Sequence, residues 1–137
     1  MVEVTINYLA VLVAAIASFA FGWIWHGVIC GKQWMKLMGF TPKSMKKMKL
    51  SPGQAMTLGF ITMLITAYVL SHFVDYLAAT TFATAAQLAF WLWLGLVMPV
   101  NAGVWIWEGK PFKLFIINTI YWLISLIVMT WILAVWP

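Results

Sequence analysis

The sequence predicts an all-α integral membrane protein in which four transmembrane helices form an up-and-down bundle. Of its 137 residues, 65% are hydrophobic and 8% are charged, whereas soluble domains average about 45–50% apolar and about 25% charged residues. The apolar residues gather in long runs separated by short polar breaks. A hydrocarbon core of about 30 Å is crossed by about 20 helical residues. We therefore expect one domain over residues 1–137, with spans at about 8–29, 53–75, 86–107 and 112–136.

The first span, 8–29, follows a short tail that holds Glu3 but no lysine or arginine. The tail therefore lacks the positive region of a secretory signal peptide, and we expect a membrane helix that is kept. Small or polar residues recur along this helix at spacings of three and four, at Ala15, Ser18, Gly22 and His26. Because small side chains let a neighbouring backbone approach closely, this face is predicted to be a helix-packing seam.

A polar segment, 31–52, separates the first two spans. It carries Lys32, Lys36, Lys43, Lys46, Lys47 and Lys49, with apolar residues between them. Such a segment is typical of an amphipathic stretch on the membrane surface, with lysine stems buried and ammonium groups in water. A solvated charged loop is an equal alternative. Thr41 and Pro42 provide a cap and a first-turn proline for a short helix. Anionic lipid headgroups are the expected partner of these lysines, and we expect no nucleic acid.

The second span begins after Ser51 and Pro52, a helix start signal, and presents Gly59, Thr62 and Thr66 as a second small-residue face. A connector without lysine, 76–86, leads to the third span. The third and fourth spans flank the break 108–111, which reads Glu-Gly-Lys-Pro. This break is too short for a domain, so it predicts a tight turn between two antiparallel helices.

The lysines also predict an orientation. All eight lie either between the first two spans or at the turn between the last two, which a four-span chain places on one side of the membrane. The positive-inside rule assigns that side to the cytoplasm. We therefore expect a multi-pass protein of the plasma (inner) membrane, with both termini on the outer side.

Several motifs resemble those of one family. They are Gly22-Trp23-Ile24-Trp25, the segment 31–40 (GKQWMKLMGF), Leu92-Trp93-Leu94-Gly95, Pro99, the segment 107–111 (WEGKP) and the segment 114–118 (LFIIN). Together they are similar to small prokaryotic membrane proteins catalogued as domain of unknown function 1761. The resemblance covers nearly the whole chain. It implies a four-span membrane protein and carries over no catalytic or ligand-binding residue.

Polar side chains inside the spans are the best sequence pointers to a site, because a polar group in hydrocarbon usually faces protein or water. Asn101 and Asn118 stand at equal sequence distances from the 108–111 turn, which predicts similar depth. We expect an intramembrane polar cluster made of His26, Asn101, Glu108, Asn118, Tyr121 and Ser125. Pro99 adds to it by freeing the carbonyl of Gly95. The cluster is either an interhelical hydrogen-bond network or a wet cavity in the cytoplasmic half.

Other kinds of site find little support. His72 and Asp75 offer only two ligands and lie far from His26, so no metal site is predicted. The single Cys30 has no partner for an internal disulfide. Motifs of hydrolases, P-loop proteins and dinucleotide-binding proteins do not occur. We therefore expect no enzyme activity and no cofactor.

Two hypotheses about function remain. The first is a non-enzymatic membrane protein that acts through helix contacts, as a homo-oligomer or as an accessory component bound to another membrane protein. The alternative is a small transporter or channel with a polar cavity around His26, Asn101 and Asn118.

Overall fold

The computed structural model describes residues 3–137, and these form helices and turns with no strand. In chain order the elements are α1 (Tyr8–Ile24), η1 (Trp25–Ile29), α2 (Gly31–Met38), α3 (Pro42–Met45), α4 (Pro52–Tyr76), α5 (Phe82–Leu92), η2 (Trp93–Val97), α6 (Met98–Ile106) and α7 (Phe112–Val135). The symbols η1 and η2 denote short π-helical segments that continue the preceding α-helix.

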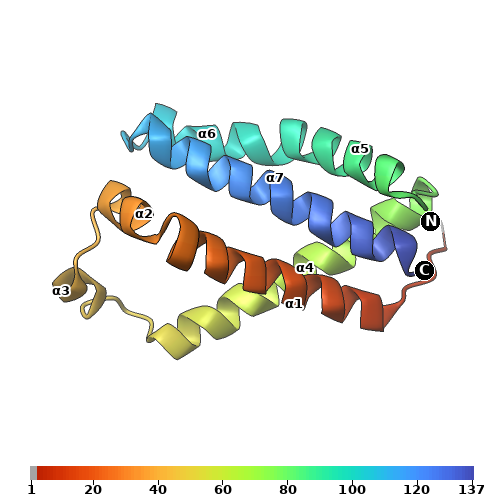
Figure 1. Cartoon of the computed structure of the whole chain (residues 1–137), viewed down its shortest axis with the longest axis horizontal. Helices are drawn as coiled ribbons and strands as arrows, with labels where there is room; N and C mark the ends of the chain where they lie inside the picture. The colour runs from red at the N-terminus through yellow and green to blue at the C-terminus, as the bar shows by residue number, and fades with distance from the viewer. Residues whose placement is uncertain (1–2) are drawn as a thin grey trace.

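Four continuous helical stretches are long and apolar enough to cross a membrane. They are Tyr8–Ile29, Pro52–Tyr76, Phe82–Ile106 and Phe112–Val135. Successive stretches run in opposite directions, and both ends of the chain lie at the end of the bundle opposite α2 and α3 (Figure 1). The all-α, four-span fold class predicted from the sequence is confirmed. We call the end formed by α2, α3 and the α6–α7 turn the basic end, since all the lysines lie in these segments or next to them.

Helix α7 is the centre of the bundle. It packs against α1, α4, α5 and α6, whereas α4 otherwise packs mainly on α1. In Figure 1, α7 runs between α1 and the α5–α6 span. In the most apolar stretch of α7, 44% of the residues are buried, but in that of the third span only 6% are. The third span is therefore attached to the bundle along one side only.

The small-residue face of the first helix is a packing seam, as predicted. Ala15 and Ser18 are fully buried. The Ser18 hydroxyl donates a hydrogen bond to Met63 Sδ on α4 at 3.6 Å. A Cβ built on Gly22 would lie 2.7 Å from the Tyr121 hydroxyl oxygen of α7. The absence of a side chain at Gly22 therefore makes room for Tyr121.

Side-chain caps determine where several helices begin. Ser51 caps α4 and exchanges hydrogen bonds with Gln54, and Thr41 caps α3 in the same way. Both starts were predicted. Thr81 forms a third capping box with Thr84, so the third span begins at Phe82 rather than near residue 86. A threonine with a second threonine three residues later satisfies the free N–H groups of a helix start, and this signal was missed.

Two π-helical segments interrupt the spans, and neither was predicted. In η1 the N–H of Cys30 bonds the carbonyl of Trp25 at 2.8 Å, and in η2 the N–H of Met98 bonds the carbonyl of Trp93. Segment η2 ends two residues before Pro99, which has no N–H to donate to the preceding turn. An i→i+5 bond places one extra residue in the turn and changes the direction of later side chains around the helix.

Candidate functional site

One groove in the part of the chain that the structure describes lies near the basic end. It has a volume of about 560 Å³ and opens between α1, η1, α2, α4 and α7. We call it the aromatic groove, because its walls include Phe19, Trp23, His26, Trp34, Tyr121 and Trp122. On the α4 side the wall is formed by smaller or flexible residues, from Ala55 to Met63.

His26 lies in this groove between two aromatic rings. Its ring centroid is 4.7 Å from that of Tyr121 and 5.2 Å from that of Trp34, both in edge-on geometry. His26 Nδ1 lies 3.1 Å from the carbonyl oxygen of Gly22. When the Nδ1–H donates to this carbonyl in the neutral tautomer, Nε2 is the ring nitrogen that can accept a hydrogen bond. The structure therefore holds His26 by one backbone bond and two aromatic contacts.

Tyr121 joins the groove to the helix core. Its ring stacks on Phe21 with centroids 5.6 Å apart, and the side chain lies beside the hydroxyls of Ser18 and Ser125. Ser125 is fully buried. Of the predicted polar cluster, the structure therefore brings His26, Tyr121 and Ser125 together.

The remaining members of the predicted cluster lie elsewhere. Asn101 Nδ2 donates to the carbonyl of Val97 in its own helix at 3.0 Å, and no hydrogen bond joins Asn101 to Asn118 within residues 3–137. Asn118 is half-buried, and Glu108 is exposed in the turn that follows α6. Equal distance from a turn fixes depth but not direction, and η2 alters the direction in which Asn101 points. His26 is the only one of His26, Asn101 and Asn118 that lines the aromatic groove.

Asn101 instead borders a second groove, between α4, the third span and α7. Two adjoining hollows of about 310 and 280 Å³ form it, and both are lined by Thr66, Leu96, Val97 and Leu126. These residues lie near the middle of their spans. We call this surface the mid-membrane groove. It exists because α4 and the third span both pack on α7 while their middle turns leave a gap between them.

One hydrogen bond and one longer polar contact attach the third span to α7, and the sequence did not indicate them. Trp93 Nε1 donates to the carbonyl of Thr119 at 2.8 Å. Thr130 Oγ1 lies 3.3 Å from the carbonyl of Ala85 and 2.6 Å from that of Leu126 in its own helix. The cross-hairpin polar contact is thus made by a tryptophan and a threonine with backbone carbonyls, not by the two asparagines.

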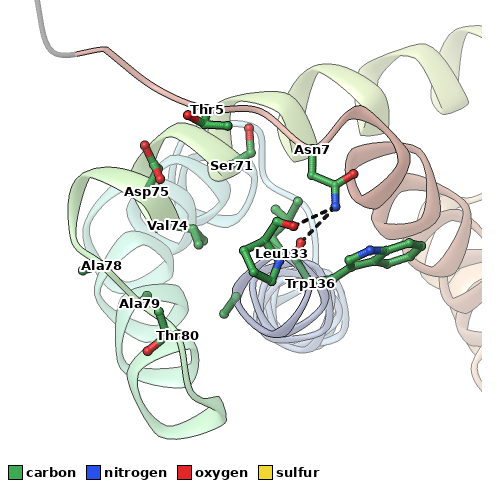
Figure 2. Close-up of a pocket in the computed structure, with 12 residues that line it drawn as sticks. Thr5, Asn7, Ser71, Val74, Asp75, Ala78, Ala79, Thr80, Leu133 and Trp136 are labelled. Atoms are coloured by element: carbon green, nitrogen blue, oxygen red, sulfur yellow. Dashed lines mark hydrogen bonds between the residues drawn. The ribbon is translucent and has the colours of Figure 1, made fainter.

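A smaller cavity of about 260 Å³ lies at the opposite end, where the two ends of the chain meet. Asn7 Nδ2 donates to the carbonyls of Trp136 and Pro137 at 3.3 and 3.2 Å, and Figure 2 shows this link beside the end of α4. Asp75 is exposed at the rim. The Asn7 hydrogen bonds beside this cavity link the start of α1 to the segment that follows α7.

The lysine-rich segment is amphipathic in α2. Lys32 and Lys36 are exposed, whereas Trp34, Met35 and Leu37 are half-buried. Every residue from Thr41 to Leu50 is exposed, including Lys43, Lys46, Lys47 and Lys49. The ammonium groups are therefore free to meet headgroups or water. Within residues 3–137, no three His, Cys, Asp or Glu side chains are grouped closely enough to hold a metal ion.

Comparison with known protein families gives a match over most of the chain. A family model described as a protein of unknown function (DUF1761) matches residues 9–134. Searches of curated proteins and of solved structures found no significant match. The matched range includes all the residues that line the aromatic groove and the mid-membrane groove.

Proposed function

We propose that this chain, which belongs to the DUF1761 family of proteins of unknown function, is a non-enzymatic membrane component that acts through helix contacts. It associates either with further copies of itself or, as an accessory subunit, with another membrane protein. The membership agrees with the motif resemblance in the sequence. The observation that supports the proposal is the exposed third span beside the mid-membrane groove.

The third span offers far more surface than α7 covers. Only 6% of the residues in its most apolar stretch are buried, and Leu96 and Val100 on the groove side are 64% and 74% exposed. In a membrane, helices associate through packing and hydrogen bonds rather than through escape from water. A groove between two spans provides the shape for such packing, because another helix contacts three elements there at once.

Asn101 supplies a polar contact for that association. Its amide nitrogen is used within its own helix, while Asn101 Oδ1 accepts no hydrogen bond within residues 3–137. An unpaired amide oxygen in a low-dielectric region costs about 1–3 kcal/mol. A donor from a partner helix removes this cost, although measured interhelical bonds in membranes average only about 0.6 kcal/mol. Asn101 therefore contributes more to the orientation of a partner helix than to the affinity for that helix.

Photo-crosslinking in native membranes tests the proposal. Benzoylphenylalanine at Leu96 faces the mid-membrane groove, and the same group at Ile16, which is 51% exposed in the middle of α1, is the matched control. We expect a discrete product from the Leu96 position and none from Ile16. Twice the chain mass identifies an oligomer, and a different discrete protein mass identifies an accessory role. Crosslinks from Leu96 to lipid alone would contradict the proposal.

Transport is the second candidate function, and the placement of His26 in the aromatic groove favours it. The groove contains a titratable imidazole near the basic end, but it includes neither Asn101 nor Asn118. Proteoliposome flux separates the two functions. If the chain acts through helix contacts, vesicles that contain the natural protein and vesicles that contain the His26→Leu variant should both leak no faster than protein-free vesicles. Flux that disappears in His26→Leu, with folding intact, would support transport instead.

A further inference from the structure

We propose that the aromatic groove is a binding site for one anionic phospholipid. An acyl chain lies between α1 and α4 against Tyr121, and the phosphate group meets the lysines of the segment that joins α2 to α4. This site is separate from the mid-membrane groove and does not depend on the function proposed for it.

The groove has the shape and chemistry of an acyl-chain site. Gly59 leaves its α4 wall open, since a Cβ built there meets only the Phe19 ring, at 3.6 Å. The one hydroxyl on that wall, Thr62 Oγ1, already donates to the carbonyl of Gly59. Phe19 and Met63 continue the apolar surface. Water gains few hydrogen bonds on such a surface, whereas methylene groups fill it without loss.

The lysines of the segment that joins α2 to α4, two elements that line the groove, favour an anionic headgroup. One wall ends in Trp34 of α2 and the other in Ala55 of the first turn of α4, and the segment between these elements crosses the basic end (Figure 1). Residues 31–52 contain six lysines and no acidic residue. The exposed ammonium groups of Lys47 and Lys49 lie closest in sequence to the start of α4. A phospholipid headgroup with a net negative charge complements these lysines better than a zwitterionic headgroup does.

Native mass spectrometry of the full chain tests this site directly. The protein is released from non-ionic micelles that contain either phosphatidylglycerol or phosphatidylcholine at equal mole fraction. We expect one phosphatidylglycerol retained per chain and much weaker retention of phosphatidylcholine. Equal retention of both lipids, or a ladder of lipids with no preferred first copy, would mean nonspecific annular lipid and would overturn the proposal.

Groove-filling variants locate the site. Gly59→Leu places a side chain in the groove, and Gly95→Leu, where a Cβ meets nothing within 4 Å, is the matched control. We expect Gly59→Leu to weaken retention about tenfold, a change equivalent to about 1.4 kcal/mol, and Gly95→Leu to leave it unchanged. If Gly59→Leu unfolds, Ala55→Trp blocks the exposed mouth instead. A folded groove variant that still retains phosphatidylglycerol would contradict the site. A variant that loses a protein dimer but keeps the lipid would contradict it as well.

Lysine pairs test the headgroup contact. Lys47→Gln with Lys49→Gln removes two charges from the segment that joins α2 to α4, and Lys110→Gln with Lys113→Gln removes two at the same end in the other hairpin. At about 0.1 M salt the Debye length is about 10 Å, so distant charges contribute little. We expect the preference for phosphatidylglycerol to fall only in the first pair. An equal fall in both pairs would show a general attraction to the basic end and would overturn the assigned phosphate position.

Discussion

Tyr121 fills the space that Gly22 leaves open between α1 and α7. A Cβ on Gly22 would lie 2.7 Å from the Tyr121 hydroxyl oxygen and 3.2 Å from Cε1. The sequence predicted that Gly22 belongs to a packing seam and that Tyr121 belongs to a polar stripe. It did not show that the two residues meet, because periodicity along one helix carries no information about the partner helix or its register.

The first prediction concerns this contact. Gly22→Ala should lower the free energy of unfolding by about 1–3 kcal/mol, the usual cost of overpacking, because the Tyr121 ring must move. Gly27→Ala, where a Cβ meets nothing within 4 Å, should be neutral or raise stability by up to about 1 kcal/mol, since alanine favours helices. Denaturant titration in bicelles, followed by circular dichroism, measures both.

Adding Tyr121→Phe tests the cause of that loss. The phenylalanine lacks the hydroxyl oxygen, which is the atom nearest the new methyl group. The double variant should therefore lose less stability than the sum of the two single variants, by more than the roughly 0.5 kcal/mol expected of independent sites. Additive losses would contradict a direct Gly22–Tyr121 contact.

The second prediction concerns the tryptophan bond to α7. Trp93→Phe keeps an aromatic ring but removes the donor to the Thr119 carbonyl, and it should cost about 0.6–1.7 kcal/mol of unfolding free energy. Trp91→Phe, at a position that is 66% exposed, should cost nothing measurable. The same bicelle titration compares the pair. Equal effects of the two substitutions would mean that the Trp93 bond contributes nothing.

At the scale of helices, apolar runs and caps predicted most of the architecture. The Ser51–Gln54 and Thr41–Ser44 caps lie where the sequence placed helix starts. The π segments were not predicted, because an i→i+5 turn leaves the overall apolar pattern unchanged. Pro99 did predict that the carbonyl of Gly95 lacks its usual helical donor. The sequence did not show that the backbone would form the π-helical segment η2 there.

The third prediction concerns Asn7, which acts on two elements. Its Oδ1 accepts from the Ala10 N–H as the N-cap of α1, while Nδ2 donates to the end of the chain after α7. Asn7→Ala loses both functions and should cost about 1–2 kcal/mol. Asn7→Ser keeps a capping oxygen but has no amide, so its loss should be smaller. Thermal unfolding in micelles ranks the two. Equal losses in the two variants would show that the cap contributes nothing and that only the link to the end of the chain stabilises the fold.

At the scale of the whole molecule, hydropathy and lysine positions predicted four spans, but not which helices are neighbours. The central place of α7 depends on contacts between segments far apart in sequence. The Asn101–Asn118 pair shows the limit: equal distance from the turn predicted equal depth, yet Asn101 borders the mid-membrane groove and bonds its own helix. His26 and Tyr121 meet because two helices from different hairpins pack together, which no local pattern encodes.

The fourth prediction concerns orientation. In a Cys30→Ser background, a cysteine at Ser44 should react with a membrane-impermeant maleimide only after lysis, because the positive-inside rule places the lysines in the cytoplasm. A cysteine at Thr80, exposed in the connector at the opposite end, should react in intact cells. The reverse pattern would invert the orientation, and reaction of both sites in intact cells would contradict the single span that separates them.

The central claim is that this chain works through contacts with other membrane helices. The most direct measurement is its native mass after gentle detergent extraction from the membrane in which it naturally occurs, for the natural chain and for Leu96→Trp. We predict a complex larger than one chain, containing further copies or one defined partner, that is weakened in Leu96→Trp because the indole fills the mid-membrane groove. A strictly monomeric chain in every gentle detergent would contradict the claim.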